Sequence, residues 1–319
     1  MLLAPCHLDD GETMSVTTAV LNVATALSPA RAFSFEWFSS LPGYRAANRA
    51  QLEAFLADIR LPSPWQGIDV ACGVGLMSEL CHEIAGKIGA LLQRTICIDL
   101  DREALDIARE KLARYPASFL QSLGQRMPLR DGAGSFLVIG NGIHNIGAQD
   151  KVALFCEAFR VLRDGASLFF NSAFYEGAVV EGTERFYTDY ISGAVRHIRR
   201  TAPWTKSEAG EKPEAARYLT PEEYVELARE AGFSDVQAHE ARVHMDQELW
   251  EAISEYAEFA QGALHYRYPP EVACPAMRQA ARDIFTSPDW EEKFPGCEEA
   301  GRRFIPRGWL WVTGRKPHT

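Results

Sequence analysis

The sequence predicts a doubly wound α/β fold built around a mostly parallel sheet, and three observations support this. Apolar runs that suit buried strands alternate with helix-like apolar spacing between about residues 65 and 174. A glycine-rich turn, with Gly73 and Gly75, directly follows the first of these runs. The length of 319 residues is enough to bury a full α/β core; roughly 100 residues are left for additions.

Composition limits the classes of partner and the compartment. The net charge of −10 disfavours a nucleic-acid partner, because phosphate contacts need a basic surface. The seven cysteines are an odd number without a C-x-x-C pair, which favours a reducing cytoplasm over a disulfide framework or a metal site. No apolar run approaches the ~20 residues that a membrane span requires. We therefore expect a cytoplasmic globular protein with no metal and no membrane partner.

Residues 1–60 are expected to form an N-terminal helical segment that packs on the core and covers the active site. The segment 45–59 has the apolar spacing of a helix. Packing on the core is enough to explain it. Alternatively, the aromatic-rich stretch 33–45 roofs the active site, and Tyr44 or Arg45 then meets a carboxylate of the bound ligand.

The central motif is the stretch 67–76, which predicts a strand, a tight turn and the start of a helix. Asp69 lies in the apolar run, and Gly73 and Gly75 follow it with the spacing D-x-x-x-G-x-G. Glycine in such a turn lets the backbone approach a ligand, and the helix N-terminus that follows points at it. A dinucleotide fingerprint, G-x-G-x-x-G, needs a third glycine where this chain has Ser78, and it does not require an acid on the strand.

The acid followed by G-x-G without a third glycine resembles motif I of the class I S-adenosylmethionine-dependent methyltransferases. The resemblance implies that Asp69, Gly73 and Gly75 belong to the cofactor site, with the glycine turn under the methionine part of S-adenosyl-L-methionine. It also implies a Rossmann-like, seven-stranded, mostly parallel sheet, here with helical cap insertions. The alternative is a glycine-rich turn in another kind of α/β protein.

A second acid lies at the end of the next apolar strand, 94–101. Asp99 follows Gly75 by 24 residues, close to the ~20-residue interval at which nucleotide-binding folds place their ribose-binding acid. A carboxylate can accept hydrogen bonds from both ribose hydroxyls. In the family resemblance Asp99 matches that acid and Leu100 matches the residue that packs on adenine, whereas Asp101 suits the N-cap of the following helix.

The segment 123–136 resembles the family's D-A-x-x-L-P-F…D-x-S-F-D region before strand four. Two positions depart from that pattern. Leu123 stands where the family has its adenine-binding acid, and Leu137 stands where the family has an acid after the phenylalanine. Recognition of adenine is therefore expected from the Gln125 side chain, or from the backbone of Gly124 and Gln125.

The loop after the fourth strand, 140–145, is expected at the carboxyl edge of the sheet, where doubly wound folds bind ligands. Asn141 matches the family's asparagine after strand four. His144 is a candidate general base, because an imidazole can take a proton near neutral pH; the alternative is a loop histidine that is hydrogen-bonded to backbone. The D/N-P-P-Y sequence of nucleic-acid amino methyltransferases and the Pro-Cys nucleophile of cytosine-5 enzymes are absent.

A helix over 151–163 carries the pattern E-A-F-R-V-L-R-D-G and precedes a continuous apolar strand over 166–173, which is typical of the family's strand-five region. The resemblance therefore covers about residues 65–174. Tyr175 and Glu176 follow at the end of the strand, where a substrate can reach them. Glu176 is a second candidate for the general base, and Tyr175 is a candidate for positioning the acceptor.

Two segments, at about 175–219 and 247–305, have no counterpart in the resemblance, and both are expected to cap the active site. The first carries a helix over 183–200 whose basic end is either solvated or meets an acidic group of the substrate. Between the segments, a helix that starts with a capping box at Thr220 precedes the sixth strand. The final strand, 309–313, is antiparallel in the family.

The expected function is S-adenosylmethionine-dependent methylation of a hydrophobic or aromatic small molecule, by one domain over 61–319 that includes both cap insertions. The aromatic-rich insertions favour this acceptor class, and the cofactor core resembles methyltransferases of quinone biosynthesis and of natural-product pathways. Three alternatives are weaker: an NAD-dependent oxidoreductase, a protein or nucleic-acid methyltransferase, and a non-catalytic or regulatory protein on the same fold. The acceptor atom and the oligomeric state do not follow from the sequence, and a homodimer is one arrangement to test.

Overall fold

The computed structural model describes residues 35–205 and 218–318, and the statements below concern these residues. The helices are α2 (Glu36–Ser40), α3 (Pro42–Ala57), α4 (Leu76–Lys87), α5 (Arg102–Lys111), the single 3₁₀ turn η1 (Ile143–Asn145), α6 (Ala148–Val161), α7 (Glu184–Thr201), α8 (Pro221–Glu230), α9 (Gln247–Ser254), α10 (Ala257–Ala263), α11 (Pro270–Phe285) and α12 (Trp290–Lys293). The strands are β1 (Trp65–Val70), β2 (Leu92–Asp99), β3 (Ala117–Gln121), β4 (Gly134–Gly140), β5 (Leu162–Ser172), β6 (Ser234–Asp246), β7 (Glu298–Glu299) and β8 (Arg302–Arg315).

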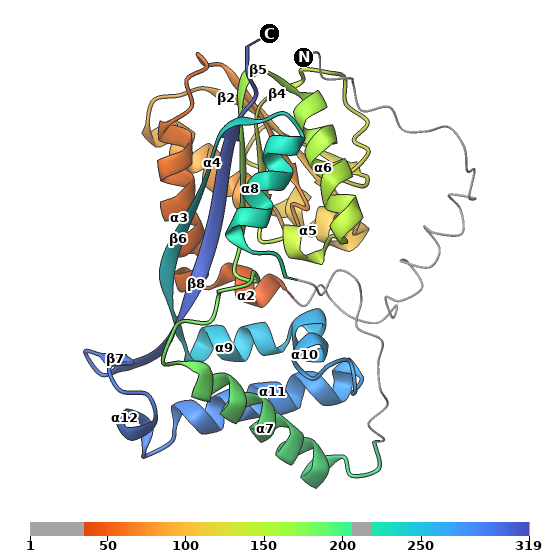
Figure 1. Cartoon of the computed structure of the whole chain (residues 1–319). Coiled ribbons are helices and arrows are strands. Elements are labelled where there is room, and N and C mark those ends of the chain that lie inside the picture. The colour runs from red at the N-terminus through yellow and green to blue at the C-terminus, as the bar shows by residue number, and fades with distance from the viewer. Residues whose placement is uncertain (1–34, 206–217, 319) are drawn as a thin grey trace. The chain divides into compact units, whose positions relative to one another are not determined.

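The main sheet has the strand order β3-β2-β1-β4-β5-β8-β6, and the short β7 pairs with β8 (Figure 1). Strands β1 to β5 run parallel, and β8 is antiparallel to both of its neighbours, β5 and β6. The strand order reverses between β1 and β4, which is where doubly wound sheets bind ligands. The predicted seven-stranded, mostly parallel α/β sheet is therefore confirmed.

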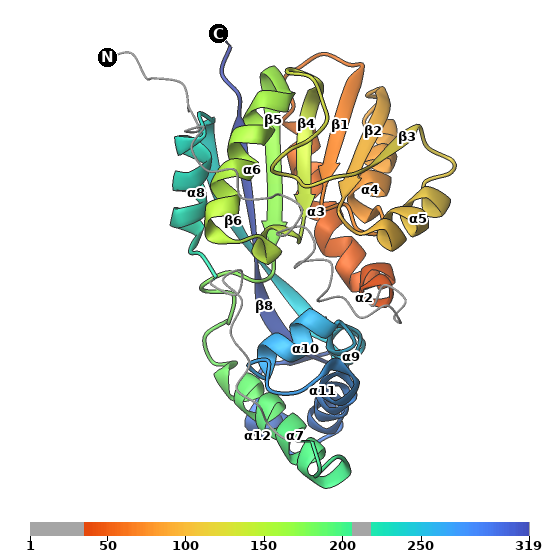
Figure 2. The same cartoon turned by 90° about the vertical axis from the view of Figure 1, so that its right-hand side faces the viewer.

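Helices cover both faces of this sheet (Figure 2). α3, α4 and α5 lie on one face, and α6 and α8 lie on the other. The central strands are apolar along their length because both faces are covered. In β4, Phe136 and Val138 pack on the α3–α4 side, whereas Leu137 and Ile139 pack on the α6–α8 side. The loops at the carboxyl edge are left to carry the candidate site.

A second group of helices, α7 and α9 to α12, packs together beyond the carboxyl edge of the parallel strands (Figures 1 and 2) and is called the helical lobe below. Tyr190 of α7 hydrogen-bonds Ser254 of α9 at 2.6 Å, and its ring centroid lies 5.5 Å from that of Trp250. β6 and β8 connect the lobe to the sheet, because their pairing continues past the end of β5 as far as Asp246 and Phe304. Helices from both segments without a counterpart thus meet in one lobe.

Two predicted helix starts are confirmed. At α8 the Thr220 hydroxyl accepts a hydrogen bond from the Glu223 N–H at 3.2 Å, and the Glu223 carboxylate accepts one from the Thr220 N–H at 2.9 Å. At α5 the Asp101 carboxylate accepts hydrogen bonds from the N–H groups of Glu103 and Ala104.

Two boundaries differ from the sequence prediction. The helix expected over 151–163 ends at Val161, because Gly165, with a φ of 75°, lies inside β5 at an irregularity of the β4–β5 pairing and does not end the helix. The final strand, expected over 309–313, begins at Arg302, because β8 pairs with the whole length of β6.

The expected N-terminal segment is described only in part. α3 corresponds to the helix predicted over 45–59, and α2 precedes it. Residues 1–34, including Phe33 of the predicted aromatic stretch, lie outside the described residues. None of the described helices combines the length and apolar character needed to cross a membrane.

Candidate active site

The turn after β1 places three residues in the left-handed region. Ala71, Gly73 and Gly75 have φ angles of 52°, 50° and 82°. A side chain at Gly75 would also bring its Cβ to 2.9 Å from Cδ1 of Leu112, so this position requires glycine for two reasons. Gly75 is the N-cap of α4, and the turn therefore brings the unpaired N–H groups of that helix to the carboxyl edge of the sheet.

Asp69 is buried beneath this turn and is held by Ser78. Its Oδ2 accepts hydrogen bonds from the backbone N–H of Ser78 at 3.0 Å and from the Ser78 hydroxyl at 2.6 Å. Burial, with a smaller contribution from the nearby Asp99 carboxylate and against the hydrogen bonds from Ser78, raises the pKa of Asp69 to about 7. The Asp69 Oδ1 has no hydrogen-bond partner among the described residues. The serine that departs from the dinucleotide fingerprint thus supports the acid of the same motif.

Asp99, at the end of β2, faces the same turn. Its Oδ2 accepts a hydrogen bond from the Gly73 N–H at 2.7 Å, and its Oδ1 accepts one from the Asp101 N–H at 2.9 Å. A carboxylate has about four acceptor positions, so about two remain for a ligand. Burial raises the pKa of Asp99, and the backbone hydrogen bonds oppose that rise. Leu100 beside it is 43% exposed, so an apolar side chain is open to a ligand next to the acid.

Gly124 and Gln125 lie near the end of β1. A Cβ at Gly124 would be 2.6 Å from Cγ1 of Val70, so the loop packs directly on the strand. The Gln125 side chain is partly buried and makes no hydrogen bond to any residue that the structure describes. Leu123, which stands where the family has an acid, is 42% exposed. The adenine contact expected from Gln125 stays a prediction.

Asn141 belongs to a buried amide network at the ends of β4 and β5. Its backbone N–H donates to Asn171 Oδ1, and its own Oδ1 accepts from the backbone N–H of Ala173, both at 2.8 Å. Asn171 donates from Nδ2 to Asn48 Oδ1 at 2.8 Å and to Gln51 Oε1 at 2.7 Å. The network supports the φ of 51° at Asn141 and ties α3 to the carboxyl edge of the sheet.

A cavity lies between this edge and the helical lobe. Its wall is mostly aromatic and apolar, with Asn141 and Arg307 as the polar side chains. The open space is about 10 Å³, room for a single water molecule. An acceptor of any larger size therefore enters only when lining side chains or the lobe shift. The lining residues are Phe38, Asn141, Ala173, Phe174, Met245, Trp250, Ile253, Phe259, Arg307 and Trp309.

His144 is buried beside this cavity. Its Nδ1 lies 3.2 Å from the Ser172 hydroxyl, and its ring centroid lies 4.4 Å from that of Phe174. Burial, with smaller contributions from the positive charges of Lys151 and Arg307, lowers the pKa of His144 to about 3. A dry and positive environment thus disfavours the imidazolium, which argues against proton uptake by His144 near neutral pH, and its role as a general base stays a prediction. Its hydrogen bond is to a side chain, so the alternative of a bond to backbone is not met either.

Tyr175 and Glu176 do not line the cavity, which corrects their expected position. β5 ends at Ser172, and Phe174 is the residue that reaches the cavity wall. Tyr175 packs with the core on the α6–α8 side; burial raises its pKa, and its hydrogen bond to Glu240 adds to this effect. Glu176 is exposed, and its backbone N–H donates to the Leu219 carbonyl at 2.9 Å.

Arg307 is the site residue that the sequence prediction missed. The final strand was expected to begin at Trp309, which left Arg307 in the short connection between the second insertion (247–305) and that strand. In the structure Ile305, Arg307 and Trp309 are alternate buried residues of β8, and Arg307 and Trp309 both line the cavity. An arginine at an inward position of the alternating I-P-R-G-W-L-W-V run is the signal that would have identified it.

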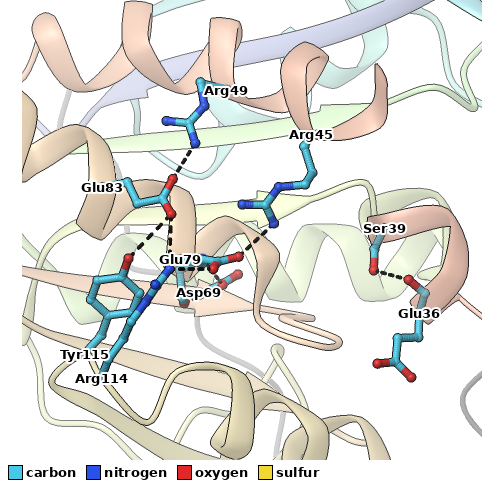
Figure 3. A network of polar contacts seen from close by, with 10 residues as sticks. Glu36, Ser39, Arg45, Arg49, Asp69, Glu79, Glu83, Arg114 and Tyr115 are labelled. Carbon is cyan, nitrogen blue, oxygen red and sulfur yellow. Dashed lines mark hydrogen bonds and ion pairs between the residues drawn. The ribbon is translucent and has the colours of Figure 1, made fainter. Parts of the chain in front are cut away.

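A network of ion pairs joins α3 to α4 beside the glycine turn (Figure 3). Glu79 accepts from Arg45 at 2.8 Å and from Arg114 at 3.1 Å, and Glu83 pairs with Arg49 and Arg114. Arg45 is therefore engaged by Glu79, which competes with the contact expected between Arg45 and a ligand carboxylate.

Tyr44, the other residue expected at a ligand carboxylate, is buried in the core. Its ring centroid lies 4.6 Å from that of Phe38 and 5.6 Å from that of Trp309. Its hydroxyl is near the amides of Asn48 and Asn141, although the Asn141 Nδ2 makes no hydrogen bond of normal geometry to a described residue. Tyr44 thus contacts the wall of the cavity from behind.

Comparisons of sequence find relatives for the part of the chain that carries the glycine turn. Residues 68–170 match the family model described as a methyltransferase domain. The ubiquinone/menaquinone biosynthesis C-methyltransferase of Campylobacter jejuni (strain 81116) is 28% identical over 169 residues, which cover 52% of this chain and 68% of that protein. The enzyme of the same name from Saccharophagus degradans is 23% identical over 203 residues, which cover 62% of this chain and 68% of that protein.

Solved structures support the fold. The YcgJ protein of Bacillus subtilis has a TM-score of 0.53 at 11% identity, covering 86% of this chain and 100% of that chain. Phosphoethanolamine N-methyltransferase 2 of Haemonchus contortus, in complex with phosphomonomethylethanolamine and S-adenosylhomocysteine, has a TM-score of 0.51 at 15% identity, covering 90% of this chain and 57% of that chain. A putative methyltransferase of Bacillus halodurans has a TM-score of 0.50 at 16% identity, covering 84% of this chain and 100% of that chain.

Proposed function

Since the chain is a class I S-adenosylmethionine-dependent methyltransferase, we propose that it methylates a hydrophobic or aromatic small molecule at the cavity between the sheet and the helical lobe. The observation that carries this proposal is one of position. The Gly73–Asp99 contact and the aromatic cavity both lie at the carboxyl edge of the same sheet, on either side of the β1–β4 switch point.

Four features make the glycine turn and its neighbours a suitable cradle for S-adenosyl-L-methionine. Gly73 and Gly75 let the backbone approach the methionine part, and the two open acceptor positions of Asp99 suit the ribose hydroxyls. Leu100 offers an apolar surface to adenine. The unpartnered Oδ1 of Asp69 is a buried acceptor for which a cationic ligand with N–H donors compensates.

The cofactor supplies an electrophilic methyl group on a sulfonium when it is bound. Methyl transfer is an in-line displacement, so the chain's contribution is to hold the acceptor atom in line at short range and to exclude water. The aromatic wall, with Phe174, Trp250 and Trp309, serves both purposes. A general base is needed only for an acceptor that must lose a proton. His144 is the candidate base beside the cavity; an anionic acceptor at Arg307 would cancel the smallest of the three causes that lower its pKa, and burial would remain the largest.

We infer a quinone-type or secondary-metabolite acceptor as the finer assignment. The sequence relatives carry the name of quinone-biosynthesis C-methyltransferases, and an aromatic wall of this kind stacks well on an aromatic ring. The NAD-dependent alternative is disfavoured, because Ser78 replaces the third glycine and supports Asp69 with two hydrogen bonds. A nucleic-acid acceptor is disfavoured by the net charge of −10.

Two measurements test the proposal. Calorimetric titration with S-adenosylhomocysteine, beside the same titration with NADH, should give micromolar binding of the first and none of the second. Transfer of labelled methyl groups from S-adenosylmethionine is then measured with a panel of hydroxylated aromatic compounds and quinols, with bulk protein and RNA as controls. Binding of NADH, or of neither nucleotide, would overturn the cofactor assignment. Methyl transfer to protein or RNA alone would overturn the acceptor class.

A further inference from the structure

Arg307 carries a buried positive charge into the wall of the cavity. The residue is 8% exposed, and the β6–β8 pairing fixes its backbone opposite Val243. Its Nε donates to the Ala173 carbonyl at 2.8 Å, and its Nη1 donates to the Tyr187 hydroxyl at 2.9 Å. A guanidinium has five N–H donors, so these two bonds leave about three, including both on Nη2, without a partner among the described residues.

The charge itself is also uncompensated within the described part of the chain. No Asp or Glu carboxylate oxygen there lies within 4.0 Å of the Arg307 guanidinium. The rings of Phe174 and Tyr187, at 5.2 and 5.7 Å, attract the cation. Such contacts offset only about 0.5–2 kcal/mol, whereas burying an ion costs several. An unpaired buried arginine in a cavity wall therefore points to an anion that arrives from outside.

A second arginine of β8, Arg303, allows a comparison of the partners that a partly buried guanidinium has in this protein. Arg303 likewise makes two uncharged hydrogen bonds, here to the carbonyls of Phe285 and Ser287, and its guanidinium also lies over an aromatic ring, that of Trp290. Arg303, however, has an acidic partner, because its Nε lies 3.3 Å from a carboxylate oxygen of Glu298. Among the described residues, Arg307 is the member of this pair that has no acidic partner.

We propose that Arg307 binds a carboxylate group of the methyl acceptor, an inference that rests on the function proposed above. A planar guanidinium binds a planar carboxylate through two parallel hydrogen bonds, which suits its free Nη donors. One guanidinium neutralises one negative charge, so a carboxylate fits better than a doubly charged phosphate in a wall that is otherwise aromatic. The acceptor is therefore an aromatic acid, with its ring against Phe174, Trp250 or Trp309 and its carboxylate at Arg307.

A purely structural role for Arg307 predicts something different. In that case its bonds to Ala173 and Tyr187 serve only to hold the end of β5 to α7, and the cavity has no preference for the charge of a ligand. Charge preference in the wild-type protein therefore separates the two roles without any substitution.

The test uses the full chain saturated with S-adenosylhomocysteine and matched probes that differ only in charge. The probe pairs are 2-naphthoate with 2-naphthamide and phenylacetate with phenylacetamide, titrated by calorimetry. We expect the acid of at least one pair to bind at least about tenfold more tightly than its amide, the range for a hydrogen bond to a charged group. Equal binding within both pairs, or no binding of any probe, would overturn the inference. Tighter binding of phenyl phosphate than of phenylacetate would overturn the choice of carboxylate.

Variants of the two β8 arginines complete the test. Arg307→Met should reduce the preference for the acid to within about twofold, Arg307→Lys should retain part of it, and Arg303→Met should leave it unchanged. If Arg307→Met does not fold, the lysine variant and the wild-type probe pairs still decide. Failure of the wild type to bind S-adenosylhomocysteine would refute the proposed function, whereas cofactor binding without a preference for the acid would refute only this inference.

Discussion

Asp99 has a structural task as well as its expected ligand. Its two carboxylate oxygens accept from the N–H groups of Gly73 and Asp101, so one side chain fixes the glycine turn and the start of α5 together. Under the proposed assignment the ribose hydroxyls would meet an acid that is already oriented, which would lower the entropy cost of binding.

Replacing this acid tests the cofactor site directly. We expect Asp99→Ala to weaken the binding of S-adenosylhomocysteine by about 1.5–3 kcal/mol, roughly 10- to 150-fold in Kd, because hydrogen bonds to a charged group are lost and the turn is less well held. Calorimetric titration gives the change in Kd, and circular dichroism checks that the variant folds.

The neighbouring acid provides the control. Asp101 caps α5 through its own carboxylate, and asparagine is also a good N-cap residue. Asp101→Asn should therefore keep the cofactor affinity within about twofold of the wild type. Equal losses in the two variants, or no loss in Asp99→Ala, would remove the ribose assignment.

At the scale of elements, Glu79 links α3 to the start of α4, beside the glycine turn. It is 7% exposed and lies in the first turn of α4, between Arg45 and Arg114. Glu79→Gln should lower the free energy of unfolding by about 1–2 kcal/mol, because two arginines lose a charged acceptor that is poorly solvated, although both arginines keep partial access to water. Urea unfolding measures the change.

The same two helices carry a matched control pair. Glu53 of α3 accepts from Lys87 of α4 at 3.1 Å, but these side chains are 39% and 71% exposed. Glu53→Gln should change the free energy of unfolding by less than about 0.5 kcal/mol, since water already solvates both charges. A cost at Glu53 as large as that at Glu79 would show that burial is not what strengthens the Glu79 pairs.

Elements were predictable where local chemistry decides them. The capping box at Thr220, the N-cap at Asp101 and the glycine turn depend on residues a few positions apart, and all three stand as predicted. The start of β8 was not predictable in this way. It depends on pairing with β6, in which Asp246 is the partner of Phe304, so the contacts that decide it are distant in the sequence and no local pattern reports them.

The residues of the candidate site were likewise predictable where a local motif positions them and not where distant strand pairing does. Asp69, Asp99 and Gly73 meet as expected, because strands β1 and β2 are adjacent and their ends are set by a local motif. Tyr175 was misplaced, because the end of β5 decides which face a residue takes and a shift of one position exchanges Tyr175 for Phe174. Arg307 was missed for the reason given for β8.

At the scale of the whole described unit, two buried ionisable groups near the candidate site have opposite effects on how stability depends on pH. The pKa of Asp69 rises from 3.8 to about 7 through burial, with Ser78 and Asp99 as its polar neighbours. The pKa of His144 falls from 6.5 to about 3 through burial, with Lys151 and Arg307 as the charges that face it. Both groups are neutral in the folded protein over much of the acid range.

Their effects on stability have opposite signs. Between about pH 4 and 7 the folded state holds a proton on Asp69 that the unfolded state releases, so the contribution of Asp69 to stability is lost as pH rises. Between about pH 3 and 6.5 the unfolded state holds a proton on His144 that the folded state does not, so the contribution of His144 is lost as pH falls. Each slope approaches about 1.4 kcal/mol per pH unit, and over the shared interval the two offset one another.

Single substitutions should therefore reveal the dependence of the unfolding free energy on pH that each group contributes, because in the wild type the two contributions offset one another. Urea unfolding without cofactor is measured at pH 4.5, 5.5 and 6.5. At each pH the free energy of unfolding of the variant is subtracted from that of the wild type. For Asp69→Asn this difference should fall with rising pH, because the wild type alone carries the buried acid. For His144→Gln the difference should rise with pH over the same interval. Differences of the same sign, or flat differences in both variants, would mean that these two groups are not held neutral by burial. The opposite pH effects of Asp69 and His144 on stability would then not exist, and His144 would be available as a base near neutral pH.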